Sequence, residues 1–338
     1  MSRSFVVNLL KYLVAVALLG LMIGLNWTQL AKLLGRPPHL LPFAGAAVIM
    51  AGCTGIQYYR WYLLVRAVGL PFTLRNAVRL GLVGTFYNVF LPGSIGGDIV
   101  KAVFIAGDHP ERKPTAVATV FFDRLIGLFG LLLLAATAGG AFWLAGDPKI
   151  AGSPRLQTVV LGCLAAAGAG VVGFLLLGLV SAAASTRIGG RLATRPLGKL
   201  LSEVWYAVMT YRRRPQTVLA VVALSAVVHV GFVVMFHLAV RVFPPDDAGL
   251  LGSLPEHFVV APIGFIVQAV IPLPGGIGGG EFTFGGLYRL IRGTDDAAAV
   301  GLAGRLTLRL VEWTLGLVGY VAYLRMRTQR PAADATGS

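Results

Sequence analysis

Long apolar runs alternate with short polar segments along the whole chain. Several runs approach or exceed the roughly 20 residues that a helix needs to cross a bilayer. We predict crossings at about residues 8–26, 42–66, 116–144, 156–183, 217–243 and 297–324. The charged fraction of 13% and the mean hydropathy of +0.77 also fit a membrane protein better than a soluble domain. The predicted fold class is therefore an all-α polytopic membrane protein.

Two further apolar stretches, at about 76–105 and 257–292, are each interrupted by nearly the same phrase. The first reads LPGSIGGD at 91–98 and the second reads LPGGIGGGE at 273–281. Each half of these stretches is shorter than a crossing requires, so we interpret each stretch as a re-entrant hairpin of two half-helices. Alternatively some halves cross the membrane, which would give eight transmembrane helices instead of six with two hairpins.

Charges are distributed unevenly between the predicted loops. Segment 187–214 is strongly basic and holds one acid, whereas segment 244–257 holds acids and no Lys or Arg. Because basic loops remain in the cytoplasm, we place 187–214 and both termini on the cytoplasmic side of an inner membrane. The apolar spacing within 187–214 predicts an amphipathic surface helix. This reading accounts for the net charge of +15, and we expect no nucleic-acid partner.

The two glycine-rich phrases belong to a longer internal repeat. They begin 182 residues apart, and the same offset brings the crossings at 42–66 and 116–144 onto the predicted crossings near 224 and 298. We predict one integral domain over 1–330, with repeats at about 42–144 and 224–326 in opposite orientation, and a disordered tail at 331–338. Inverted repeats with broken helices are typical of secondary transporters, although glycine-rich phrases also recur by chance.

Proline and glycine in each phrase end a helix and let the next half-helix begin inside the membrane. Its free N–H groups attract anions, and glycine lets a head group approach the backbone. The alternative is close helix packing through small residues. On the first reading, the two phrases floor one cavity, and Asn88 satisfies backbone groups at the first turn. The predicted binding glycines are Gly93, Gly96, Gly97, Gly275, Gly278 and Gly279.

An acid follows each phrase, Asp98 in the first and Glu281 in the second. Both lie in the first turn of a predicted half-helix, where they would cap the helix and complement its dipole. The functional alternative is a proton or cation site, or one half of an ion pair that changes partners. Lys101 lies three residues after Asp98, on the same helix face, and is expected to pair with it.

Few other charges interrupt the apolar runs. A charge at mid-membrane costs roughly 2.5–3.5 kcal/mol on insertion scales, so such residues usually have a function. We assign Lys101, Arg124, Arg305 and Arg309 to a basic cluster for a phosphate group, with internal salt bridges as the alternative. The predicted coupling and ion-pair residues are Arg60, Asp98, Asp123, Glu281 and Glu312. We expect core roles for His229 and His237, packing roles for the two cysteines, and neither a metal nor a cofactor.

Four segments resemble the flippase-like integral membrane family, which shares its domain with the transmembrane part of lysylphosphatidylglycerol synthases. They are RWYLLV (60–65), NVFLPGSIGGDIVKA (88–102), FFDRLIGL (121–128) and IPLPGGIGGGEF (271–282). The resemblance implies a lipid-translocating role, with phospholipids or polyprenyl-phosphate carriers as the substrate class. The matching positions are Asn88, Pro92, Gly93, Gly96, Gly97, Asp98, Asp123, Arg124 and Glu281. The family usually has Arg at the place of Lys101, and often Arg-Glu where this chain has Gly280-Glu281.

The first functional hypothesis is a transporter that moves an anionic lipid by alternating access. An intramembrane lipid head-group enzyme and a scaffold that binds envelope or glycan biosynthesis enzymes are the alternatives. The chain ends about a dozen residues after its last predicted crossing. We therefore expect the stand-alone form without the soluble aminoacyl-transferase domain, and no lysyl transfer. There is also no Walker A sequence.

Overall fold

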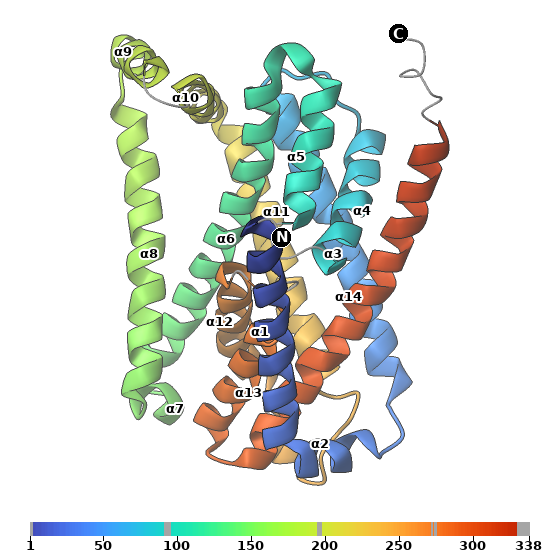
Figure 1. Cartoon of the computed structure of the whole chain (residues 1–338). Coiled ribbons are helices and arrows are strands. Elements are labelled where there is room, and N and C mark those ends of the chain that lie inside the picture. Colours follow the sequence, from blue (N-terminus) through green and yellow to red (C-terminus); the bar gives the residue numbers. More distant parts are fainter. Residues whose placement is uncertain (1–2, 91–95, 195–197, 272, 274–275, 330–338) are drawn as a thin grey trace.

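A computed structural model describes residues 3–90, 96–194, 198–271, 273 and 276–329. The described residues form helices, turns and loops, with no strand among them, which confirms the all-α class. The long helices stand side by side in one bundle (Figure 1). The helices are α1 (Arg3–Leu25), α2 (Trp27–Leu34), α3 (Leu40–Ala67), α4 (Leu74–Phe90), α5 (Gly96–Asp108), η1 (Pro110–Arg112), α6 (Lys113–Leu144), α7 (Pro148–Ala151), α8 (Pro154–Leu179), α9 (Ala182–Ala193), α10 (Gly198–Arg212), α11 (Pro215–Ala239), η2 (Ala248–Leu251), α12 (Leu254–Val270), α13 (Gly279–Arg292) and α14 (Asp295–Gln329).

Four helical segments of the described chain are long and apolar enough to cross a membrane. They are α3, η1 with α6, α8 and α11, and the count is five if α1 and α2, which meet at a bend of 81°, form one broken span. The polytopic membrane class is therefore confirmed. Helix α14 covers the last predicted crossing, but its composition is less apolar because it carries Arg305, Arg309 and Glu312.

Each stretch that carries a glycine-rich phrase forms a pair of packed helices. α4 and α5 contain 17 and 13 residues, and α12 and α13 contain 17 and 14 residues, all below the roughly 20 of a full crossing. The α4–α5 pair lies in the upper half of the bundle and the α12–α13 pair in the lower half (Figure 1). These lengths and positions agree with hairpins that turn inside the membrane.

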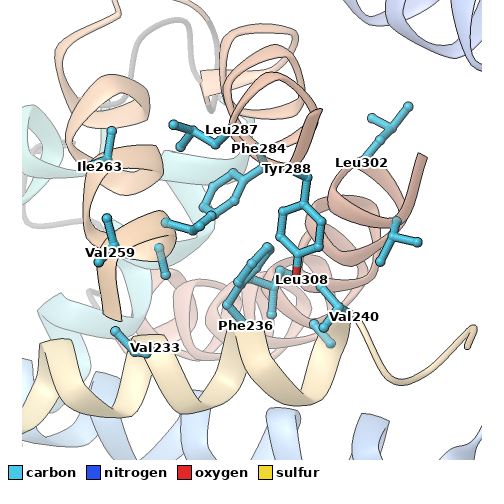
Figure 2. Packing of buried hydrophobic residues seen from close by; sticks show 14 of the residues in the cluster. Val233, Phe236, Val240, Val259, Ile263, Phe284, Leu287, Tyr288, Leu302 and Leu308 are labelled. Atoms are coloured by element: carbon cyan, nitrogen blue, oxygen red, sulfur yellow. The ribbon is translucent and has the colours of Figure 1, made fainter. Parts of the chain in front are cut away.

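The helices pack in a reciprocal pattern between the two halves of the chain. α3 packs against α11, α4 packs against α14, and α12 packs against α6. Around α11, Figure 2 shows Phe236 beside Phe284 and Tyr288 of α13, at ring-centroid distances of 4.5 and 6.0 Å. The core therefore joins helices from both halves, and neither hairpin is covered by its own half alone.

Segment 187–214 differs from the single amphipathic helix that the sequence predicts. It falls on two helices, α9 and α10, which pack against each other at one end of the bundle (Figure 1). The indole N–H of Trp205 in α10 donates to the carbonyl of Ser185 in α9 at 3.0 Å. The two cysteines are buried free thiols, as a packing role requires. The predicted tail at 331–338 lies outside the described residues.

Candidate functional site

A polar cavity of about 310 Å³ lies within the apolar bundle. That volume is at the lower end of the range for small-molecule sites. Residues of α3, α4, α5, α6, α11, α12 and α14 line it, so both halves of the chain contribute. The charged residues in its wall are Arg60, Asp98, Lys101, Asp123, Arg124, Arg309 and Glu312. The cavity thus brings together most of the charges that the sequence places inside apolar runs.

Asp98 lies in the first turn of α5 and contacts two cations. Its Oδ1 is 2.9 Å from Lys101 Nζ, and its Oδ2 accepts from Arg124 Nη1 of α6 at 3.4 Å. The predicted pairing with Lys101 is therefore present. The Lys101 ammonium also lies 5.2 Å from the centroid of the Trp61 ring, within cation–π range. These contacts hold a carboxylate and two cations together at the cavity wall.

The first phrase packs α4 closely against α5. Asn88 Oδ1 accepts from the N–H of Gly97 at 2.8 Å, the role that the sequence predicts for this amide. A Cβ added to Gly97 would lie 1.9 Å from the carbonyl oxygen of Gly84 in α4. Gly96 and Gly97 are buried and are not among the cavity-lining residues. The geometry therefore favours helix packing over head-group contact for these two glycines, and Gly93 lies outside the described residues.

Arg60 and Asp123 form a buried ion pair between α3 and α6. Arg60 Nε donates to Asp123 Oδ1 at 2.8 Å, and its Nη2 donates to the Asp123 carbonyl at 3.2 Å. The Nη1 group donates to Ser225 Oγ of α11 at 3.0 Å. Because the guanidinium of this α3 residue binds groups on α6 and α11, it ties three helices together at the wall of the cavity as well as contributing charge.

A second charge network joins α13 to α14. Arg309 Nε donates to Glu281 Oε1 at 2.6 Å, and Arg305 Nη2 donates to Glu312 Oε2 at 3.0 Å. The Arg305–Glu312 pair lies within α14, as the alternative of internal salt bridges requires. The Arg309–Glu281 pair instead joins two helices. Arg309 and Glu312 line the cavity, whereas Glu281 and Arg305 are fully buried and are not among its lining residues.

Like Gly96 and Gly97 of the first phrase, Gly278 and Gly279 of the second phrase are not among the residues that line the cavity. Gly278 has a φ of +81°, and a Cβ there would lie 2.7 Å from Cβ of Leu18 in α1. Gly279 packs in the same way against Ile271, and Gly275 lies outside the described residues. The close neighbours of Gly278 and Gly279 favour a packing role for these glycines, and their contact with a substrate stays a prediction. Gln268 of α12 reaches the cavity from this side.

Residues 8–319 match the family described as lysylphosphatidylglycerol synthase TM region. The chain belongs to this family. No curated protein matches the chain significantly. Membership places the protein among membrane proteins of lipid or envelope metabolism, and it confirms the family resemblance of the four quoted segments.

In this family member, the cavity also contains neutral polar and aromatic side chains that sequence reasoning missed. Tyr58 OH and Thr85 Oγ1 are 2.7 Å apart across the α3–α4 contact. In the sequence, these polar lining residues could have been found from the isolated amides that interrupt apolar runs, such as Gln57 and Gln268. His229 also lines the cavity, and its Nε2 donates to the carbonyl of Gly127 at 2.8 Å. The predicted core role therefore describes the burial of His229 but not its position at the cavity wall. The further lining residues are Thr54, Trp61, Phe232, Phe265 and Trp313.

Proposed function

We propose that the protein moves an anionic lipid across the membrane, with the head group in the polar cavity and the tails in the surrounding lipid. The observation that carries this proposal is a cavity with charged residues in its wall that is lined by helices of both halves of the chain. Charges inside a membrane protein are costly and normally mark a substrate or ion pathway. Membership in a lipid-related membrane family supports the same substrate class.

Lys101 and Arg124 are the groups proposed to bind the phosphate. Both contact Asp98 and both line the cavity, with 12% and 37% of their side chains exposed. Phosphate oxygens accept strong charge-assisted hydrogen bonds from such cations. An arriving phosphate therefore takes the place of Asp98 as their partner, while the Arg60–Asp123 and Arg309–Glu281 pairs hold the helices around it.

Alternating access between two inverted repeats is the proposed motion. The reciprocal packing of α4 on α14 and of α12 on α6 is the pattern that a pseudo-two-fold axis between the halves produces. The two hairpins also approach from opposite ends of the bundle (Figure 1). Rocking of one half against the other would open the cavity to one side and then to the other.

The charge distribution supports a cytoplasmic location for the α9–α10 end in an inner membrane. Arg187, Arg191 and Arg212 lie on these two helices. At the opposite end, Asp246 is 92% exposed and forms an ion pair with Arg36. Basic segments remain in the cytoplasm, so the end that carries α9, α10 and the last turns of α14 is proposed to face inward.

Reconstitution into liposomes tests the function directly. Labelled anionic phospholipids and a polyprenyl phosphate are followed across the bilayer with wild type, Arg124→Gln and a surface control, Arg289→Gln. Arg289 is 65% exposed and pairs with Asp295, so its loss should leave transport unchanged. We expect wild type and the control to move an anionic lipid and Arg124→Gln to lose most of the rate. Movement of no lipid by folded wild type would refute the proposal, and a chemically altered lipid would favour the head-group enzyme.

A further inference from the structure

A hydrogen-bonded chain of ionisable side chains lies at the end of the bundle opposite α9 and α10, away from the lining of the polar cavity. His237 Nδ1 in the last turn of α11 is 2.8 Å from His257 Nδ1 near the start of α12. His257 Nε2 contacts the hydroxyl of Tyr288 in α13, and this hydroxyl donates to the carbonyl of Leu251 in η2 at 2.9 Å. We call these three side chains the histidine latch, because they connect the second hairpin to α11 and η2.

The protons of the latch have one consistent arrangement when both imidazoles are neutral. The hydroxyl of Tyr288 has one proton, which it donates to Leu251, so His257 Nε2 donates to the hydroxyl oxygen. A neutral imidazole has a single N–H group, and His257 Nδ1 is therefore the acceptor for the N–H at His237 Nδ1. In this arrangement, every contact within the latch is a hydrogen bond and neither imidazole carries a charge.

Arg241 places a permanent positive charge against the latch. Its guanidinium donates to the carbonyl of His237 at 2.7 Å and to that of Gly252 at 2.9 Å, and its Nη1 lies 3.1 Å from His237 Nδ1. Gly252 has a φ of +76°, and a Cβ there would lie 2.9 Å from His257 Nε2. Glycine thus lets the loop after η2 lie directly on the latch. Arg241 holds this loop in place and also opposes a second positive charge on His237.

The other charged groups near the latch already have partners. They are Glu256 with Lys149 and Arg292, Asp246 with Arg36, Asp295 with Arg289, and Asp247 at the start of η2. At this end, residues 40–52 of α3, 127–144 of α6 and 297–304 of α14 carry no ionisable side chain. Among the described residues, no carboxylate forms an ion pair with either imidazole of the latch, so an added proton would have Arg241 beside it and no counter-charge of its own.

Facing imidazoles can also indicate a metal site, but this geometry does not fit one. Two imidazole nitrogens on one tetrahedral zinc ion lie about 3.3 Å apart, because each Zn–N bond is about 2.0–2.1 Å long. The 2.8 Å between the two Nδ1 atoms is too short for a shared ion and is typical of a hydrogen bond. The part of the chain that the structure describes also holds no group of three side chains that could bind a metal ion.

We propose that His237 and His257 form a proton-sensing site, which holds the second hairpin on α11 and η2 while it is neutral and releases it when it binds a proton. Histidine is the side chain that normally changes charge between about pH 5 and 8. A proton added to His257 goes to Nδ1, where it faces the N–H of His237 and breaks their hydrogen bond. A proton added to His237 goes to Nε2 and places a second cation beside Arg241, whose guanidinium then leaves the loop.

Hydrogen exchange of the full chain in detergent micelles tests this release. Amide exchange of residues 248–258 is followed by mass spectrometry at about pH 8 and about pH 5 and corrected for the intrinsic effect of pH. We expect wild type to lose about tenfold of its protection in acid, whereas residues 215–230 of α11 change little. The double variant His237→Gln/His257→Gln should show the same protection at both values. His39→Gln, an exposed histidine at the same end, is the control and should keep the wild-type response.

Arg241→Gln separates repulsion between charges from a general effect of acid. It keeps both histidines but removes the neighbouring cation, so the acid response should fall to about threefold or less. Wild-type protection that is equal at both pH values would overturn the inference, as would an undiminished acid response in the double variant. Zinc-dependent protection at about pH 8 that requires both histidines would identify a metal site instead. These readouts need no lipid movement, so their failure and the failure of the proposed transport function are distinguishable.

Discussion

Replacing Arg309 with methionine should destabilise the protein strongly, because the substitution leaves the carboxylate of Glu281 buried without the cation that donates a hydrogen bond to it. Glu281 has no exposed surface, and its two oxygens accept from Arg309 Nε at 2.6 Å and from the N–H of Gly278 at 2.8 Å. Breaking a buried pair by removing one partner costs about 3–5 kcal/mol. Arg305 also interacts electrostatically with Glu281, so we expect a loss of about 3 kcal/mol, near the lower value.

The measurement is the free energy of unfolding in mixed micelles, followed by tryptophan fluorescence. The double variant Glu281→Gln/Arg309→Met removes both charges and keeps an acceptor for Gly278, so it should lose much less than the single Arg309→Met. Arg289→Met, at an exposed ion pair, is the control and should change stability by less than about 0.5 kcal/mol. A loss below about 1 kcal/mol for Arg309→Met, or strict additivity in the double variant, would refute the reasoning.

Three further perturbations follow from the geometry. Gly97→Ala should cost about 1–3 kcal/mol of stability, because the new methyl group meets a carbonyl of α4, and unchanged thermal unfolding would contradict this. Gly278→Ala should lower the melting temperature more than Gly24→Ala, since only Gly278 has a positive φ and a close neighbour; equal shifts would argue against a packing role. In a variant without native cysteines, an impermeant maleimide should label Asp246→Cys in intact cells and Arg187→Cys only after permeabilisation. The reverse pattern would invert the proposed topology.

Periodicity and spacing were sufficient for the local part of this architecture. Apolar runs placed the long helices, and the three-residue spacing identified the contact of Asp98 with Lys101. The amide of Asn88 also serves the backbone of the first turn as predicted. Each of these features depends on residues that are close in the chain, where helix geometry determines which side chains meet.

Partners that are distant in the chain were not predictable in the same way. The three charges of α14 share a helix face, yet Arg309 turns to Glu281 while Arg305 keeps Glu312. Likewise, Asp123 pairs with Arg60 of another helix. Such choices depend on how the helices cross, and helix crossing is determined by packing across the whole bundle. For the same reason, the sequence did not indicate that Gly278 would lie against α1.

The reciprocal packing of the halves has a consequence for biogenesis. The face of α4 that packs on α14 includes the carbonyl of Leu82, which approaches Gly319 so closely that an added Cβ would lie 2.3 Å from it. The ribosome makes α4 early and α14 last. Until the final helix is inserted, the first hairpin lacks the surface that covers it, and the cavity lacks the part of its wall that Arg309, Glu312 and Trp313 supply. Proteases of the membrane that recognise incompletely packed helices would therefore degrade chains truncated before α14, even when every residue of the first half is intact.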